Sequence, residues 1–379
     1  MHNIAIFVTD YSLLGGVQKV TYYLAELMYK AGMPIKCIIS QHDSHDMCYN
    51  YSMKVEVLED GHESHGRLEK ILSSYNIKNV IIQIEDLLAM TPLVDFISSC
   101  NCRVYPVLHS SPLCYVKKYY SWRDYISTPR FVAQYFKMRF YYRPKHLKCF
   151  KSLTDKYGFI CVSQHARQEL CNILGLSYNT KKVNYIYNPI MQEASLLVGE
   201  TADKENLIVY AGRLSPEKRP LLMLKMWKAI YQDYPDWLFY ILGDGPEKHR
   251  MENYIRRKRL ERMILKGAVN NVPDYLKKSK IALLFSKYEG LPTSILEAGM
   301  NDNALIVTKS DGGGCDIVED GKNGFVVSSR DMATIIKKVS YLINNDGSEA
   351  VKMGKENRTL LVKFSNEKIL KDWQLLLRE

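Results

Sequence analysis

The sequence contains no long apolar run. None of its hydrophobic stretches approaches the roughly 20 residues that a membrane-spanning helix requires. The first ten residues carry no basic start and no small-residue cleavage site, so we expect a β-strand over residues 3–9 rather than a signal peptide. These absences predict a cytoplasmic protein that does not cross a membrane.

Metal and redox motifs are also missing. The nine cysteines are scattered and odd in number, and the close pair Cys100 and Cys102 lacks the two-residue gap of a zinc or thiol redox motif. The histidines in polar stretches, such as His62 and His65, show no metal-ligand pattern either. We therefore expect free thiols in a reducing compartment and no bound metal ion.

The chain has fewer acidic than basic residues. The chain has 52 Lys and Arg against 41 Asp and Glu, a net charge of +11, which favours a phosphorylated substrate, a phospholipid surface or nucleic acid as partner. Nine cations are interleaved with aromatic residues between positions 115 and 148. Such a segment suits an anionic membrane interface, although a helical pair with inward-facing aromatics explains the composition equally well. We expect no nucleic-acid partner, because the chain has no RNA- or DNA-binding motif.

Short apolar runs separated by helical stretches are abundant. At 379 residues, with 46% hydrophobic and 25% charged residues, the chain is long enough for two domains with separate cores. The alternation predicts parallel sheets with crossover helices. The expected strands cover residues 3–9, 35–40, 55–58, 79–84, 103–108, 159–162, 183–186, 207–211, 237–242, 263–266, 281–285, 304–308 and 324–327.

The fold class is therefore α/β, with two Rossmann-like domains that face each other across a cleft. The first is expected over residues 1–190 and the second over 191–365, joined by a polar linker near 198–206. Residues 366–379 have the pattern of an amphipathic helix.

The most informative segment follows the apolar run at 281–285. It delivers Glu289 to the carboxyl end of a strand, Gly290 permits a tight turn, and Pro292 suits the first position of a helix. Free N–H groups and the helix dipole at such a start favour an anion such as phosphate. Glu297 lies about one turn further along the same helix, where a carboxylate can hold ribose hydroxyls.

This Glu-x7-Glu arrangement, which opens with Glu-Gly-Leu-Pro, resembles the signature of retaining GT-B glycosyltransferases of family four (glycosyl transferases group 1). The resemblance covers nearly the whole chain. It implies that Glu289 faces the donor sugar, that Glu297 binds the ribose, and that a terminal helix at 366–379 crosses back onto the first domain. The expected diphosphate-binding residues are Gly290, Leu291, Pro292 and Thr293.

Two pairs of motif residues match the same family. Gly15 and Gly16 follow the first strand, and Gly16 is expected to contact donor phosphate or acceptor. The spacing of the two glycines is not the Gly-x-Gly-x-x-Gly of dinucleotide enzymes. Arg213 and Lys218 follow the strand at 207–211. An Arg fork and a Lys point charge can stabilise a departing diphosphate without a metal ion.

Two single residues complete the expected site. His109 ends a strand where the family has a histidine that contacts the donor sugar. Val269 follows Gly267 and Ala268, where related enzymes pass their backbone beside the nucleotide base. The resemblance thus assigns catalysis to Glu289, His109, Arg213 and Lys218.

The resemblance implies retaining transfer of a hexosyl group from a nucleotide diphosphate sugar, by default a UDP-sugar, to a hydroxyl of a saccharide acceptor. The donor is a substrate, and no separate cofactor is expected. The chain also lacks the Asp-x-Asp pair that metal-dependent GT-A transferases use.

We expect a lipid-linked acceptor of bacterial surface polysaccharide synthesis, such as capsule or O-antigen, and a peripheral position on the inner face of the plasma membrane. A GT-B-shaped nucleotide-sugar epimerase and a non-catalytic nucleotide-sugar-binding protein are the alternatives.

Overall fold

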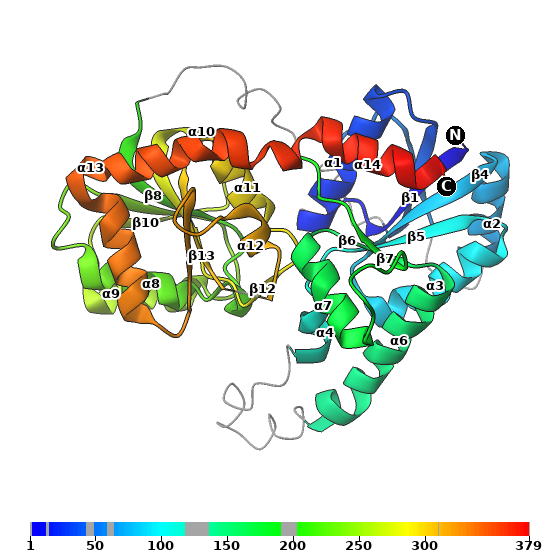
Figure 1. The fold of residues 1–379 in the computed structure, drawn as a ribbon, viewed down its shortest axis with the longest axis horizontal. Helices are drawn as coiled ribbons and strands as arrows, with labels where there is room; N and C mark the ends of the chain where they lie inside the picture. The colour runs from blue at the N-terminus through cyan, green and yellow to red at the C-terminus, as the bar shows by residue number, and fades with distance from the viewer. Residues whose placement is uncertain are drawn as a thin grey trace. The chain divides into compact units, whose positions relative to one another are not determined.

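The computed structural model describes residues 2–12, 15–42, 49–58, 64–117, 136–190, 203–309 and 311–378. The chain divides into two compact units (Figure 1). Unit 1 comprises Met1–Met191 and Phe364–Glu379, and unit 2 comprises Gln192–Lys363. Each unit is a parallel sheet covered by helices on both faces, the arrangement that the alternating apolar runs predicted.

The sheet of unit 1 has seven parallel strands in the order β3-β2-β1-β4-β5-β6-β7. They are β1 (Asn3–Asp10), β2 (Ile35–His42), β3 (Lys54–Val57), β4 (Ile77–Ile84), β5 (Arg103–Leu108), β6 (Phe159–Cys161) and β7 (Val183–Tyr185). Each expected strand of the first half overlaps one of them. The connection order reverses between β1 and β4, and open α/β sheets bind ligands outside the carboxyl ends of strands at such a point.

Helices cover both faces of this sheet. They are α1 (Gly16–Lys30), α2 (Ser64–Ser74), α3 (Leu87–Ser99), α4 (Pro112–Lys117), η2 (Met138–Tyr142), α6 (Arg143–Lys156), α7 (Gln164–Leu174) and α14 (Asn366–Arg378). Fully buried Phe7, Phe150 and Phe159 lie in the core of the unit. The part of the basic aromatic segment at 118–135 lies outside the described residues.

The C-terminal helix α14 belongs to unit 1 and packs near α1 (Figure 1). Its apolar stripe buries Ile369, Trp373 and Leu377, as the amphipathic pattern predicted. At its start, the Asn366 side chain donates to the Ile190 carbonyl at 2.9 Å and accepts from the Ile190 N–H at 3.3 Å. The segment that leaves unit 1 and the segment that returns to it are therefore fixed side by side.

Unit 2 has a six-stranded parallel sheet in the order β10-β9-β8-β11-β13-β15. The strands are β8 (Glu205–Ala211), β9 (Leu238–Leu242), β10 (Met263–Gly267), β11 (Ser279–Leu284), β13 (Ala304–Thr308) and β15 (Gly324–Val327). These six were expected from the sequence, whereas the short parallel pair β12 (Tyr288–Glu289) and β14 (Asp311–Gly312) was not. The connection order here reverses between β8 and β11.

The helices of unit 2 pack around buried Tyr210, Trp227 and Phe239. They are η3 (Pro216–Lys218), α8 (Pro220–Ile230), α9 (Lys248–Lys258), α10 (Val272–Lys278), α11 (Thr293–Met300), α12 (Gly314–Ile317), α13 (Met332–Leu360) and η4 (Val362–Phe364). The long α13 bends where Asn344 to Gly347 leave helical backbone angles.

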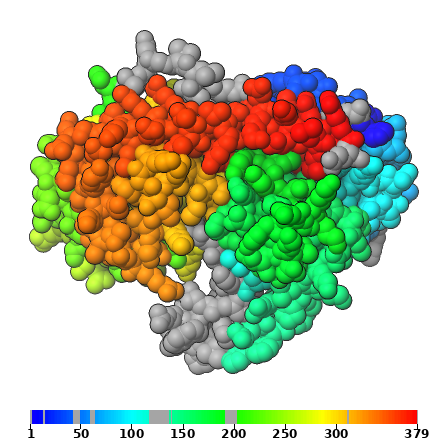
Figure 2. Space-filling view, in the orientation of Figure 1, coloured from blue at the N-terminus to red at the C-terminus, as the bar shows by residue number. Residues whose placement is uncertain are grey.

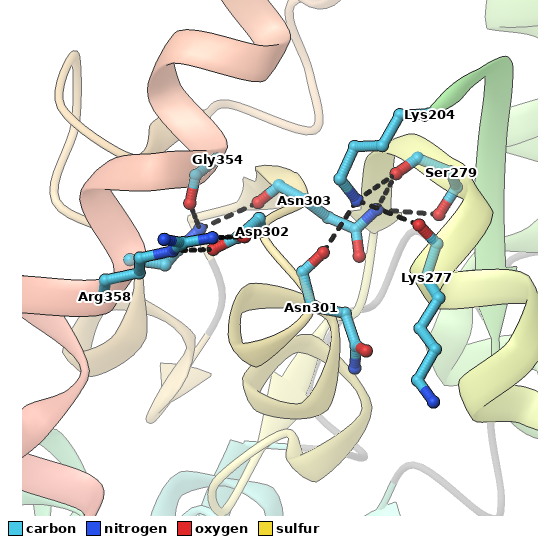
Figure 3. A network of polar contacts seen from close by, with 9 residues as sticks. Lys204, Lys277, Ser279, Asn301, Asp302, Asn303, Gly354 and Arg358 are labelled. Atoms are coloured by element: carbon cyan, nitrogen blue, oxygen red, sulfur yellow. Dashed lines mark hydrogen bonds and ion pairs between the residues drawn. The ribbon is translucent and has the colours of Figure 1, made fainter. Parts of the chain in front are cut away.

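The amino edge of the unit 2 sheet is closed by a polar network around the turn at residues 301–303 (Figure 3). The Lys204 ammonium donates to the carbonyls of Ser279 and Asn301, both at 2.7 Å. At the same turn, Arg358 on α13 pairs with Asp302 at 2.7 Å. The first described residues of unit 2 and its long final helix are thus fixed to one turn.

Candidate active site

Unit 2 places its predicted site residues at the carboxyl edge of its sheet. Arg213 follows β8, Val269 follows β10 and Glu289 follows β11. Because parallel strands all end at the same edge, these loops are neighbours although they are far apart in the sequence. Arg213 is exposed and Val269 half-buried.

Glycine at position 243 lets the strand ends of unit 2 approach closely. Gly243 has φ 142°, and a Cβ atom there would lie 2.0 Å from the carbonyl oxygen of Gly212. The Gly212 N–H donates to the Leu242 carbonyl at 2.9 Å, and the Gly243 N–H donates to the Gly267 carbonyl at 2.7 Å. Backbone hydrogen bonding therefore continues past the ends of β8, β9 and β10, which fixes the start of the Arg213 loop.

The central feature of the unit 2 edge is an ion pair between Lys218 and Glu289. The Lys218 Nζ contacts Glu289 Oε1, and the two side chains are 21% and 12% exposed. Backbone contacts join the same two loops, because the Lys287 N–H donates to the Glu217 carbonyl at 2.7 Å. The Arg219 guanidinium also donates to the Ser286 carbonyl at 3.1 Å. The loop after β8 and the loop after β11 are thus joined across the point where the strand order reverses.

This ion pair joins two residues whose expected roles were separate. From the sequence, Lys218 was expected at the diphosphate and Glu289 at the sugar, and a contact between them was not predicted. In the structure the carboxylate of Glu289 balances the ammonium charge of Lys218. Arg213 is exposed at the same edge, and its carbonyl accepts a hydrogen bond from the Tyr210 hydroxyl at 2.9 Å.

The backbone of Glu289 is held by a glycine pair. Gly312 on β14 has φ 106°, and a Cβ atom there would lie 1.5 Å from the Glu289 carbonyl oxygen. The Gly313 N–H donates to the Gly290 carbonyl at 2.8 Å. The glycine run at 312–314, read from the sequence as structural, thus supports the Glu289 turn through its backbone.

The turn after Glu289 leads into α11. The expectation that Pro292 is the first helical residue is wrong by one position: Pro292 has extended backbone (ψ 93°), and the helix begins at Thr293. The N-cap residue Pro292 makes no side-chain cap. The Ile295 and Leu296 N–H groups donate to the Pro292 carbonyl at 3.1 and 3.2 Å. An anion at this helix start would therefore be bound by the N–H groups of Thr293 and Ser294. Leu291 is buried, and Glu297, one turn into the helix, is half-buried.

Unit 1 has a comparable link at its own reversal point. Gly15 and Gly16 follow β1 and open α1, and Glu85 follows β4. The Gln18 Nε2 donates to both carboxylate oxygens of Glu85, at 3.2 and 3.3 Å. A Cβ atom on Gly15 would lie 2.1 Å from Gln18 Oε1, whereas the exposed Gly16 has open space around it. Gly15 therefore makes room for Gln18, and Gly16 leaves its backbone accessible.

His109 lies one strand away from this link. It follows β5, and its Nε2 contacts Oε1 of the fully buried Gln83. Burial lowers the pKa of His109 to about 4, so the imidazole is neutral at neutral pH. Burial also raises the pKa of Glu85. The edge of unit 1 therefore offers hydrogen-bonding groups rather than concentrated positive charge.

Glu85, Gln18 and Gln83 were not expected from the sequence. One signal was available for Glu85: it directly follows an apolar run, the position that drew attention to Glu289. The structure brings Lys218 and Glu289 into contact within unit 2, whereas Gly16 and His109 belong to unit 1. The cleft that was expected to bring together the site residues of unit 1 and those of unit 2 stays a prediction.

The described residues contain neither a metal-site cluster nor a membrane-spanning helix. No cluster of three or more His, Cys, Asp or Glu side chains there has the arrangement of a metal site. None of the helices described combines the length and the apolar character that a bilayer span requires.

Comparison with known proteins defines the class. Residues 194–360 match the family model of glycosyl transferases group 1. A segment of 170 residues is 28% identical to poly(ribitol-phosphate) α-N-acetylglucosaminyltransferase of Staphylococcus aureus, covering 45% of this chain and 34% of that protein. A segment of 139 residues is 34% identical to UDP-Gal:α-D-GlcNAc-diphosphoundecaprenol α-1,3-galactosyltransferase of Escherichia coli, covering 35% and 36%. The chain thus spans about a third of the length of these two relatives.

Solved structures extend the likeness over the whole chain. S. aureus TarM, in complex with UDP, has a TM-score of 0.77 at 15% identity, with 100% of both chains covered. Anabaena HepE with UDP and glucose has a TM-score of 0.72 at 15% identity, again with 100% of both chains covered. These likenesses confirm the GT-B fold. The chain is therefore a GT-B protein whose second unit belongs to glycosyl transferases group 1.

Proposed function

We propose that this protein is a retaining glycosyltransferase that moves a hexosyl group from a nucleotide diphosphate sugar to a hydroxyl of a saccharide acceptor. The observation that carries the proposal is the Lys218–Glu289 ion pair beside the uncapped start of α11. It combines a fixed carboxylate, a cation and oriented N–H groups at one sheet edge, the set that a sugar bound to a diphosphate requires.

The donor is held mainly by unit 2. Its diphosphate binds the N–H groups at the start of α11 and the exposed guanidinium of Arg213. Lys218 extends from Glu289 to a phosphate oxygen, so that one ammonium is shared between carboxylate and phosphate. Glu297 accepts hydrogen bonds from the ribose hydroxyls, and Val269 packs beside the base.

Transfer proceeds on one face of the sugar. The acceptor hydroxyl oxygen forms a bond to the anomeric carbon while the bond from that carbon to the diphosphate oxygen breaks. The proton of the acceptor moves to the departing oxygen. Arg213, Lys218 and the α11 amides stabilise the negative charge that develops there, and Glu289 offsets positive charge on the sugar. Protein cations take the place of a metal ion in this scheme.

The relatives support a bacterial surface polysaccharide as the setting. The names of the two relatives given above describe transfer of N-acetylglucosamine to poly(ribitol-phosphate) and of galactose from UDP-Gal to a diphosphoundecaprenol-linked sugar. We propose a UDP-sugar as donor and a lipid-linked saccharide as acceptor.

A panel of nucleotide sugars, read by mass spectrometry with and without acceptor, tests this function. We expect nucleotide release that depends on acceptor, an α-configured product from an α-linked donor, and no loss of rate in EDTA. Conversion of the donor into an epimer without acceptor would overturn the transferase proposal. If the protein binds UDP but turns over none of the nucleotide sugars in the panel, the transferase proposal is also overturned, and the protein is a binding protein.

A further inference from the structure

Helix α6 in unit 1 is anchored to the core along one face, which buries His146, Phe150, Leu153 and Thr154. Its C-terminal half faces the core, where Phe150 and Leu153 are fully buried and the Phe150 ring lies 5.7 Å from that of Phe159. The N-terminal end, with the preceding η2, lies at the molecular surface, and α6 forms the lower edge of unit 1 in Figure 2. Core packing therefore fixes α6 but does not explain the residues at its start.

Those residues expose aromatic rings. Phe136, Phe140 and Tyr141 are 52%, 66% and 50% exposed. The rings of Phe136 and Phe140 stack with centroids 5.9 Å apart. One of the two interpretations of this segment, that its aromatic rings pack inward, therefore does not account for Phe136, Phe140 and Tyr141. An exposed pair of phenylalanines points to an interaction surface.

Cations surround the exposed rings. Six Lys and Arg and no Asp or Glu lie between Phe136 and Thr154. The Arg139 guanidinium lies 5.9 Å from the Phe140 ring centroid, and the Lys145 ammonium lies 3.9 Å from that of Tyr141. The charges therefore lie beside the apolar rings rather than on an opposite face.

We propose that residues 136–148 form the surface by which this protein binds an anionic lipid bilayer. Aromatic rings can enter the boundary between headgroups and acyl chains while neighbouring cations contact lipid phosphates. Single-stranded nucleic acid fits less well, because Phe136 and Phe140 stack on each other and so occupy ring faces that bases would need. The biological purpose, access to a lipid-linked acceptor, rests on the proposed function, but the binding itself does not.

Vesicle co-sedimentation of the full chain tests the surface directly, without any transferase assay. Vesicles of phosphatidylglycerol and phosphatidylcholine are compared with phosphatidylcholine alone, at low and high salt. Two double variants are used: Phe136→Ser with Phe140→Ser, and Arg139→Glu with Lys145→Glu. A control on α9, Arg257→Glu with Lys258→Glu, makes the same charge change at exposed cations that lack a neighbouring phenylalanine pair.

We expect binding to the anionic vesicles that weakens at high salt. The Phe double variant should bind about tenfold more weakly, and the charge-reversal variant at least about tenfold more weakly. The α9 control should stay within about twofold of the unaltered protein. Thermal unfolding should be unchanged in all variants, since the altered side chains are exposed.

Three results would overturn the proposal. The first is that the α9 control loses as much vesicle binding as the charge-reversal variant. The second is that the same residues bind oligonucleotides more tightly than vesicles. The third is that the protein is a dimer that dissociates in the Phe variant. Lack of transferase activity in a protein that still binds vesicles through this surface would instead count against the proposed function alone.

Discussion

The carboxyl edges of the two units are built alike and charged differently. In each unit, a side chain that follows the first strand contacts a glutamate on the other side of the point where the strand order reverses. In unit 1 the link is the neutral Gln18 to Glu85, and in unit 2 it is the cationic Lys218 to Glu289. Unit 2 adds the exposed Arg213, whereas His109 in unit 1 is neutral.

The proposed function assigns different ligands to the two edges. A diphosphate is stabilised by positive charge and by N–H groups, which we propose that the edge of unit 2 supplies. A saccharide hydroxyl needs neutral or acceptor groups, which suit the edge of unit 1. On this proposal, the side chains at the strand ends adapt one parallel-sheet architecture to two kinds of ligand.

The largest expected effect is on turnover when Glu289 is changed to Gln. Loss of the carboxylate removes the charge that offsets positive charge on the sugar, so kcat should fall by about 10²- to 10³-fold. Steady-state kinetics with the best donor measure this, and UDP calorimetry checks that the nucleotide still binds. The matched variant Glu85→Gln should reduce kcat less. Equal losses of kcat in the two variants would show that Glu289 and Glu85 do not differ in their importance for turnover.

The Arg213→Met variant should lower kcat by about 10²-fold, because the departing diphosphate loses an exposed cation. Its unfolding free energy should not change, since the side chain is exposed. Lys218→Met should both slow turnover and lower the unfolding free energy by about 1–3 kcal/mol, because Glu289 is left without its partner. Chemical denaturation separates the two variants. Equal destabilisation by both would contradict the ion pair.

A glycine comparison tests the backbone of each edge. Gly312→Ala should destabilise unit 2 by at least about 1 kcal/mol, because φ is positive and the new Cβ would clash with the Glu289 carbonyl. Gly16→Ala should change stability by less than about 0.5 kcal/mol, since the space around Gly16 is open. Urea denaturation measures both. Similar values would mean that the Glu289 turn does not depend on Gly312.

The last expected effect concerns acid stability in unit 1. The pKa of His109 is lowered from 6.5 to about 4 by burial, so below pH 6.5 the unfolded chain takes up a proton that the folded chain refuses. The unfolding free energy should therefore fall as pH drops from about 6.5 to 4, by about 1–3 kcal/mol from this residue. His109→Asn should flatten that slope, as denaturation at several pH values would show. An unchanged slope would mean that the ring is solvated.

The sequence predicted the two sheets because buried parallel strands are continuous apolar runs bounded by turn residues. It also predicted a helix after Glu289, to within one position of its observed start at Thr293, since a glycine and a proline mark that turn. It did not predict β12 and β14, because two-residue strands have no periodicity. Nor did it predict the Gln18–Glu85 and Lys218–Glu289 links, whose members are 67 and 71 residues apart, since single polar residues do not reveal their long-range partners.

The turn at residues 301–303 in unit 2 has a mechanical consequence. Lys204, near the start of the unit, and Arg358, near its end, are both anchored there, and in unit 1 Ile190 is tied to Asn366. Within each unit, the first and last segments of the chain are therefore held at a common anchoring point. Loss of that anchor would release both segments of the unit at once.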